Sequence, residues 1–146
     1  MPVTQYPDPQ RQSQFYADVP GKRLLAWVID ALIIFLISTL IVVMTAFVGL
    51  FFLPLVVFMT SMAYRTITIA GRSATFGMRI AAIELRNSAG LRLSFGEAFL
   101  HTLGYLITIS TAIAQMISII LMCASEKGQS LSDMVLGTVM LNTRAK

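Results

Sequence analysis

The longest uncharged stretch of the chain limits its possible folds most strongly. From Leu24 to Tyr64 the only charged side chain is that of Asp30. At about 1.5 Å per residue, a helix of this length would be roughly 60 Å long, about twice the ~30 Å hydrocarbon core of a bilayer. The stretch is therefore expected to cross a membrane, turn and cross back.

The composition also indicates an integral membrane protein. Hydrophobic residues make up 56% of the 146 residues and charged residues only 12%, and the mean hydropathy is +0.76. These values exclude an ordinary soluble globule, and the length suits one domain. The net charge of +4 comes from singly scattered basic residues without interleaved aromatic residues, so no nucleic-acid partner is expected.

Three hydrophobic helices are predicted, at about residues 24–44, 51–69 and 98–124. Pro54 falls in the first turn of the second helix, where its missing N–H is tolerated. The third segment either crosses once or folds back as a shallow helical hairpin. Hydropathy favours the single crossing, whereas placing every Lys and Arg on one side favours the hairpin.

The predicted membrane domain comprises residues 22–146 and follows a polar tail, 1–21, that is expected to be disordered or to lie on the membrane surface. Because this tail precedes an apolar run much longer than a secretory h-region, no cleaved signal peptide is expected. Between the second and third helices lies a polar loop, 71–97, and the last segment, 125–146, is also polar; both are expected on the cytoplasmic side.

Both polar segments contain signs of regular structure. In the loop, apolar and polar residues alternate over 83–86 and 91–94 on either side of a short turn, which predicts a β-hairpin. In the C-terminal segment, Ser130 or Ser132 is expected to cap a short helical turn that ends at Gly137. Residues 138–142 have strand composition and are expected to extend the hairpin into a small cytoplasmic sheet.

Asp30 is the strongest candidate for a functional side chain. A carboxylate inside a span costs at least ~2.5 kcal/mol on insertion scales, so such residues usually serve a function and have a partner. If the turn is centred near residues 47–48, antiparallel packing brings Arg65 to the level of Asp30. We therefore predict that these two residues pair inside the membrane. Arg23, seven residues before Asp30 and on nearly the same helix face, should lie nearer the interface.

Small and polar residues recur along the third hydrophobic segment. Ser110, Ala114 and Ser118 are spaced by four residues, and Gln115 lies beside them. Small residues at this spacing allow helices to approach closely, and an amide can bridge to a neighbouring helix. A helix-packing face is the preferred interpretation, and a pore lining is the alternative.

Few residues suited to catalysis or metal binding are available. Cys123 is the single cysteine and His101 the single histidine, so neither a disulfide framework nor a thiolate metal site is expected. No nucleophile lies at a recognisable spacing from a base. The sequence therefore predicts a protein that is not an enzyme and that uses no metal or cofactor.

Three charged residues resemble the pattern of the RDD family of small bacterial membrane proteins. They are Arg23 at the start of the first helix, Asp30 within it, and Asp133 within the stretch 129–138. The resemblance covers about residues 22–142.

A loop motif supports this resemblance. Residues 71–80 are similar to the threonine-x-glycine-lysine signature of the family, with Met78 in place of the lysine. This substitution weakens any role of the signature lysine, although the neighbouring Arg79 could supply the charge.

The resemblance implies a bacterial inner-membrane protein, and transport of ions or small molecules has been suggested for the family. We expect an all-α membrane protein with a small cytoplasmic sheet, a cytoplasmic N-terminus, and a functional charged core of Arg23, Asp30, Arg65 and Asp133. Since three hydrophobic segments cannot enclose a pathway, transport would need a homo-oligomer or a partner membrane protein. The alternative is a non-transporting assembly or partner subunit, in which the same charges clasp the helices together.

Overall fold

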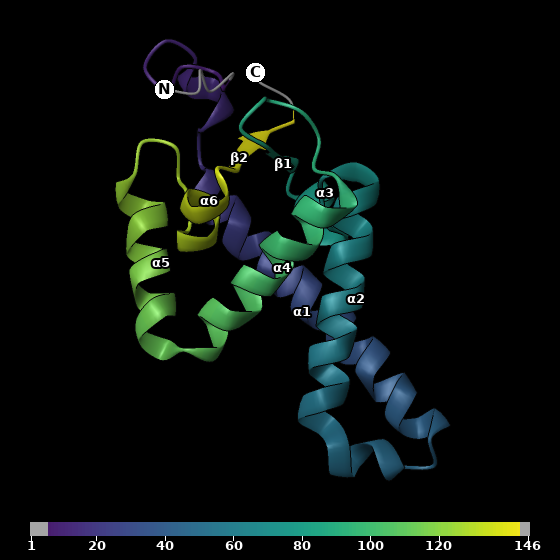
Figure 1. Cartoon of the computed structure of the whole chain (residues 1–146). Helices are drawn as coiled ribbons and strands as arrows, with labels where there is room; N and C mark the ends of the chain where they lie inside the picture. The colour runs from purple at the N-terminus through teal and green to yellow at the C-terminus, as the bar shows by residue number, and fades with distance from the viewer. Residues whose placement is uncertain (1–5, 144–146) are drawn as a thin grey trace.

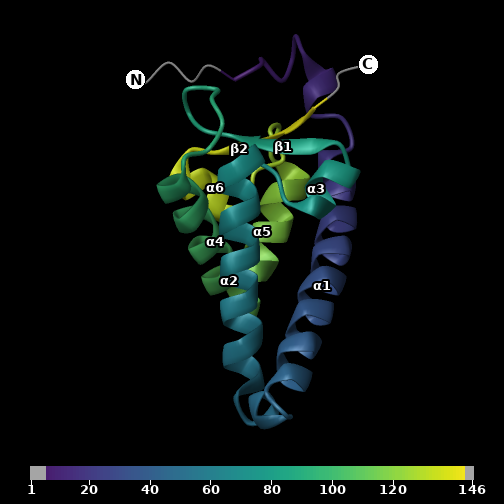
Figure 2. The same ribbon diagram turned by 90° about the vertical axis from the view of Figure 1, so that its right-hand side faces the viewer.

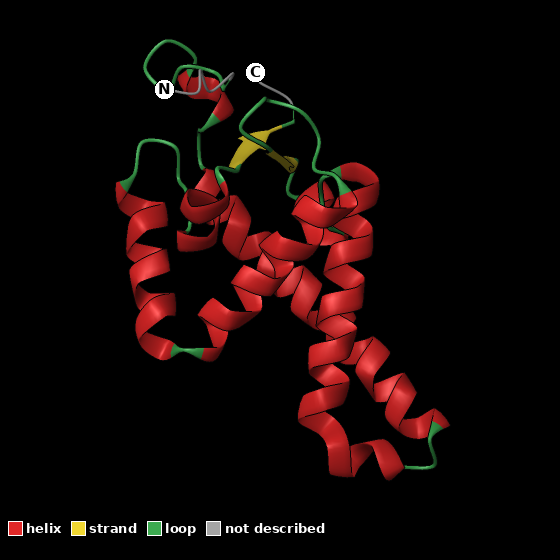
Figure 3. Cartoon of the chain, viewed as in Figure 1, coloured by secondary structure: helices red, strands yellow, loops and turns green. Residues whose placement is uncertain are grey.

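The computed structural model describes residues 6–143 and is mainly helical (Figure 1, Figure 3). A long helical hairpin reaches away from a small sheet, which lies at the opposite end of the molecule (Figure 2). Residues 1–5 of the predicted tail and residues 144–146 of the predicted C-terminal segment lie outside the described residues.

The hairpin consists of α1 (Val19–Met44) and α2 (Leu53–Arg72), joined through a short 3-10 helix, η2 (Val48–Phe52). The helical stretches Ser13–Met44 and Val48–Arg72 are both long and apolar enough to cross a membrane, which confirms the two predicted spans. Helix α1 begins before the predicted residue 24, because Pro20 occupies its first turn, where a helix tolerates proline.

The third hydrophobic segment is broken into α4 (Phe95–Ser110) and α5 (Ala112–Ala124), which are bent by 116°. Helix α5 returns toward the sheet, and the α4–α5 turn stops short of the α1–α2 turn (Figure 1, Figure 2). The segment therefore has the geometry of the shallow hairpin rather than that of one straight helix.

Hydroxyl groups in the last turn of α4 explain the break. Thr108, Ser110 and Thr111 donate to carbonyls four residues earlier, at 2.7, 2.7 and 3.4 Å. Such hydroxyl-to-carbonyl bonds bend helices, and the Thr111 hydroxyl also pairs the Ile107 carbonyl in the last turn. Thr111 itself adopts an extended conformation with φ −119° and ψ 108°. A change of direction inside an apolar region thus leaves fewer backbone groups unpaired.

The break also changes the predicted packing face. Ser110 belongs to α4, whereas Ala114 and Ser118 belong to α5, so the three residues do not form one stripe on one helix. Ser118 alone is buried, and its hydroxyl accepts a hydrogen bond from the Leu131 N–H at 3.1 Å. The three residues therefore do not share one helix face, and a role in helix packing stays a prediction.

The sheet has two antiparallel strands, β1 (Ile83–Arg86) and β2 (Val139–Asn142), with Ile83 opposite Asn142. This confirms a small sheet that includes the C-terminal strand. The predicted hairpin is wrong, because residues 91–94 form no strand. The Leu93 N–H instead donates to the Ser73 hydroxyl at 2.7 Å, which draws this segment toward the end of α2.

Two short helices flank the sheet: α3 (Phe76–Ile80) and α6 (Leu131–Leu136). The side chains of Thr75 and Ser130 cap them by accepting hydrogen bonds from the backbone N–H three residues later, at 3.2 Å in both. Gly137 ends α6 in the left-handed conformation with φ 69°, as the sequence predicts.

The described part of the N-terminal tail packs against the sheet end. It contains a 3-10 helix, η1 (Ser13–Phe15). The amide of Asn142 donates to the carbonyls of Gln14 and Ala17 at 2.8 and 2.9 Å, and its oxygen accepts from the Lys22 ammonium group at 2.7 Å. The interpretation of the tail as disordered is therefore wrong for residues 6–18.

Candidate functional site

Asp30 joins three helices through its carboxylate. It is buried in α1, and its Oδ1 accepts from the Tyr64 hydroxyl of α2 at 2.7 Å and from the Gly77 N–H of α3 at 2.9 Å. Its Oδ2 accepts from the Thr75 hydroxyl at 2.6 Å. We name this cluster of Asp30, Tyr64, Thr75 and Gly77 the Asp30 clasp; it fixes α3 onto the membrane hairpin.

Arg65 lies beside the Asp30 clasp, as predicted, but it binds loosely. Its Nη1 is 3.7 Å from Asp30 Oδ2, which makes an ion pair beyond normal hydrogen-bond length. Its guanidinium carbon lies 4.3 Å from the centre of the Tyr105 ring, and Nη2 is 3.5 Å from the Tyr105 hydroxyl. The strong hydrogen bonds to Asp30 therefore come from the clasp and not from Arg65.

Asp133 forms the centre of a second cluster. Its Oδ2 accepts from Arg23 Nη1 at 2.7 Å and from the Ser130 N–H at 3.0 Å. Its Oδ1 lies 2.7 Å from His101 Nε2 and accepts from the Thr138 hydroxyl at 3.0 Å. We name these five residues the Asp133 clasp. Arg23 therefore pairs with Asp133, about two helical turns nearer the start of α1 than Asp30.

The electrostatics of the Asp133 clasp favour a charged carboxylate. Complete burial would raise the pKa of Asp133, but Arg23, His101 and the Ser130 N–H outweigh burial, and the pKa is lowered below its ordinary value. Arg23 and Asp133 consequently form a true ion pair, which connects the start of α1 to α6.

A cavity of about 600 Å³ lies between α1, α4 and α5. Arg65, Asp30, His101 and Tyr105 line it, and so do Gln115 and Ser118 of the predicted packing face. Both arginines of the predicted core thus border one cavity, whereas Asp133 is held behind Arg23 and His101.

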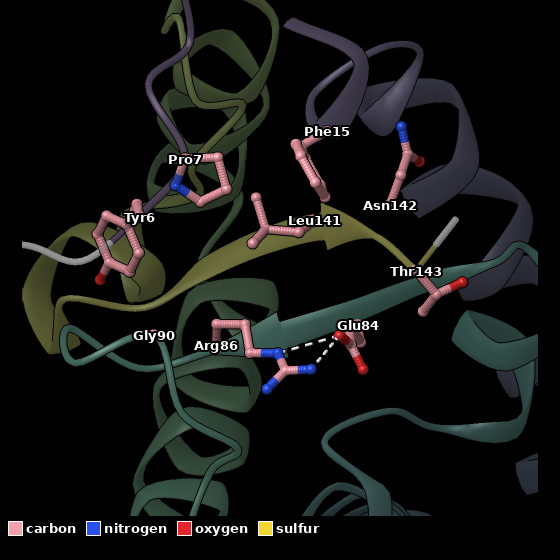
Figure 4. Close-up of a pocket in the computed structure, with 9 residues that line it drawn as sticks. All are labelled: Tyr6, Pro7, Phe15, Glu84, Arg86, Gly90, Leu141, Asn142 and Thr143. Atoms are coloured by element: carbon pink, nitrogen blue, oxygen red, sulfur yellow. Dashed lines mark hydrogen bonds and ion pairs between the residues drawn. The ribbon is translucent and has the colours of Figure 1, made fainter. Parts of the chain in front are cut away.

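A second cavity, of about 370 Å³, lies at the outer side of the sheet (Figure 4). It is lined by Tyr6, Phe15 and Leu141, together with Glu84 and Arg86. Glu84 and Arg86 pair with each other along β1, so their charges are already matched. We therefore place the candidate site in the cavity that Arg65 borders.

The model of the RDD family matches residues 18–137 of the chain. The chain belongs to the RDD family. No match was found among curated proteins or among solved structures. The three charged residues that carry the resemblance divide between the two clasps of this RDD-family protein: Asp30 in one, Arg23 and Asp133 in the other.

The RDD-family loop motif acts through its threonine and glycine in this chain. Thr75 and Gly77 bind Asp30, while Met78, at the position of the signature lysine, is buried and borders the cavity. The guanidinium group of Arg79, which could supply the charge of that lysine, lies over the ring of Phe76, at 5.1 Å, and Arg79 is exposed.

Sequence reasoning missed several partners in both clasps. Tyr64, Thr75 and Gly77 at Asp30, and His101 and Thr138 at Asp133, were not among the predicted site residues. The loop motif supplied a signal for Thr75 and Gly77, because it is a family signature. The sequence contains no comparable signal for His101, which comes from a distant helix.

Replacement of Tyr64 by phenylalanine tests the Asp30 clasp. Tyr64→Phe removes the hydroxyl that donates to Asp30 and accepts from the Phe76 N–H at 3.3 Å. We expect the free energy of unfolding to fall by about 1–3 kcal/mol, because a buried carboxylate loses a donor. Tyr16→Phe is the matched control, since the one hydrogen bond of the Tyr16 hydroxyl within residues 6–143 is to the Pro7 carbonyl, outside the clasp. Equal losses for both variants in a detergent unfolding titration would contradict this role.

Proposed function

We propose that this RDD-family protein transports a small organic solute and that the cavity between α1, α4 and α5 forms part of the pathway. The observation that supports this most directly is the cavity itself, which is bordered by the charged Arg65 within the hydrophobic part of the chain. Ionisable residues inside membrane segments usually mark pathways or ligand sites. Its volume of about 600 Å³ also suits a small-molecule site.

The hydrogen bonds favour a solute that accepts hydrogen bonds over a metal cation. Both oxygens of Asp30 are engaged by the clasp, so this carboxylate offers little capacity to a cation. The polar contacts of Arg65 are long, and its guanidinium group, which lies over the Tyr105 ring, can donate to an incoming group. The guanidinium group would also repel a cation. An organic anion is therefore a more favourable solute for this cavity than a cation.

Transport requires more than one chain in this proposal. The α1–α2 hairpin and the shallow α4–α5 hairpin leave large apolar side chains exposed along their length. Three hydrophobic segments cannot enclose a pathway on their own. A homo-oligomer, or a complex with another membrane protein, would close the pathway. We propose that this complex catalyses no covalent reaction.

We further propose the bacterial inner membrane as its location, with the sheet end in the cytoplasm. Apart from Arg65, the described Lys and Arg residues lie near the start of α1, at the last residue of α2 or outside this hairpin, whereas the α1–α2 turn carries no charge. The positive-inside rule places such an uncharged turn on the outer side.

Solute flux into sealed proteoliposomes tests the proposed function. We expect uptake of benzenesulfonate, an anion that stays charged, and no uptake of sodium or potassium. Arg65→Gln should abolish this uptake, while Arg72→Gln, the same change at an exposed position of α2, should leave it unchanged. Circular dichroism and gel filtration must show that both variants fold and insert.

A second candidate function is an assembly or partner subunit without transport. The two clasps favour it, because both buried carboxylates are bound within the chain itself and stabilise its fold. Folded wild-type protein that moves none of the tested solutes would overturn the transport proposal. Recovery of the same membrane protein partner from native membranes would then support the second function.

A further inference from the structure

The cavity between α1, α4 and α5 differs in character between its exposed and buried parts. Among its lining residues, the large exposed side chains are apolar: Leu24 is 64% exposed, Trp27 43% and Ile119 46%. They belong to α1 and α5, so the cavity opens between these two helices. In a bilayer such an opening faces hydrocarbon, and a ligand can enter through it from the membrane.

The buried part of the cavity contains polar side chains, and not all of their hydrogen-bond donors are paired. Arg65 is only 6% exposed, and its Nε has no hydrogen-bond partner among the described residues. A guanidinium group carries five N–H donors, and burial of an unpaired donor costs about 1–3 kcal/mol. Arg65 thus brings to the lining of the cavity a positively charged group whose donors are not all paired.

The carboxylates near Arg65 do not pair its free N–H donors. Asp30 is bound by Tyr64, Thr75 and Gly77, and lies 3.7 Å from Arg65 at the nearest atoms. Asp133 is bound by Arg23 and His101 and does not border the cavity. A planar guanidinium fork matches carboxylate, sulfate or phosphate oxygens better than it matches any neutral acceptor.

We propose that the cavity binds an amphipathic anion that enters sideways from the bilayer. Its anionic head accepts hydrogen bonds from Arg65, and its hydrocarbon chain lies along Leu24, Trp27 and Ile119. The inference rests on the proposed function, because it names the class of solute for the same cavity. The shared chemistry, an acyl chain with an anionic head, is found both in free fatty acids and in anionic phospholipids.

Trp27 provides a built-in probe of this site. It is the single tryptophan of the chain, it borders the cavity, and its indole N–H donates to the Tyr105 hydroxyl at 2.7 Å. Tyr105 in turn contacts Arg65. A bound chain that carries bromine atoms should therefore quench Trp27 fluorescence by direct contact.

The test is a titration of the purified full-length protein in detergent with 9,10-dibromostearate. We expect saturable quenching, weak quenching by the methyl ester of the same acid, and a half-saturation point at least tenfold higher for Arg65→Gln. Arg72→Gln should bind as wild type does. If Arg65→Gln fails to fold, Arg65→Lys, which keeps the charge but loses the fork, should show a smaller rise of the same sign.

Competition distinguishes the two sources of the ligand. Displacement of dibromostearate by stearate alone identifies a free fatty acid, and displacement by phosphatidylglycerol at a lower mole fraction identifies a membrane lipid; both results support the proposal. Equal quenching by the acid and its ester would overturn it, as would an Arg65→Gln titration identical to that of wild type. Displacement by acetate as effective as that by stearate would also overturn it, because the chain would contribute nothing.

The quenching titration and the flux assay test the ligand site and transport separately. Saturable, Arg65-dependent quenching without flux of any tested solute would retain this binding site and refute transport. Flux of benzenesulfonate without saturable quenching would retain transport and refute the amphipathic ligand.

Discussion

Asp133→Asn is expected to lower the free energy of unfolding by about 3–5 kcal/mol, the cost of breaking a buried ion pair by removing one partner. The carboxylate has no exposed surface and binds Arg23, Ser130 N–H, His101 and Thr138. An asparagine would place an amide donor among these donors and would leave Arg23 without its counter-charge. Because the clasp joins α1, α4 and α6, the whole sheet end should loosen.

Unfolding in detergent, followed by circular dichroism, measures this loss. Asp18→Asn is the control, because Asp18 is exposed just before α1 and tolerates asparagine in its left-handed conformation, with φ 57°. We expect the control to change stability by no more than about 0.5 kcal/mol. An Asp133→Asn protein within about 1 kcal/mol of wild type would show that the clasp contributes little to stability.

Gly77→Ala should have the second large effect. A Cβ atom at this position would overlap the Ala26 carbonyl oxygen of α1 and would lie 2.8 Å from Asp30 Oδ1. The backbone of a membrane helix cannot move aside easily, so α3 would have to leave α1 and release the Asp30 carboxylate. We expect a loss at or above the upper end of the ~1–3 kcal/mol range for overpacking.

Gly96→Ala is a closely matched control for this change. Gly96 and Gly77 are both the second residue of a helix whose N-cap is Ser or Thr. A Cβ at Gly96, however, would meet no atom within 4 Å. Alanine has the higher helix propensity, so Gly96→Ala should leave stability unchanged or raise it slightly. Similar losses for the two variants, measured by the same unfolding titration, would show that close approach to α1 is not the cause.

Local patterns in the sequence predicted the membrane hairpin and the contact of Asp30 with Arg65. The uncharged run is long enough for two spans, and a turn near residues 47–48 places residues 30 and 65 at one level. The capped turn before Gly137 was also predictable, because helix caps depend on neighbouring residues. In each of these cases the relevant contacts are local or follow from simple antiparallel geometry.

Contacts between distant segments were not predictable in this way. Strand β1, residues 83–86, pairs with β2, residues 139–142. No local sequence pattern predicts which strand will pair with β1. The contact of His101 with Asp133 likewise depends on how α4 and α6 pack. The break at Thr111 did have a local signal in the clustered hydroxyls, although the spacing of Ser110, Ala114 and Ser118 suggested one continuous helix.

Arg65 and the Asp30 clasp occupy different surroundings in this structure. Thr75 binds Asp30 and caps α3, and it does not border the cavity; Arg65 borders the cavity and holds Asp30 only loosely. Replacement of Thr75 should therefore lower stability without altering the solute site. Replacement of Arg65 by lysine should alter the site while retaining a positive charge beside Asp30.

Benzenesulfonate uptake per folded protein, compared between Thr75→Val and Arg65→Lys proteoliposomes, tests this claim most directly. At a temperature where both variants are folded, Thr75→Val should retain uptake close to wild type despite a lower Tm. With solute well below saturation, Arg65→Lys should lose about nine-tenths of the uptake or more, equivalent to about 1.4 kcal/mol at the solute site, with a smaller change in Tm. The opposite pattern, with uptake lost in Thr75→Val and kept in Arg65→Lys, would contradict the assignment of Arg65 to the solute and of Asp30 to the fold.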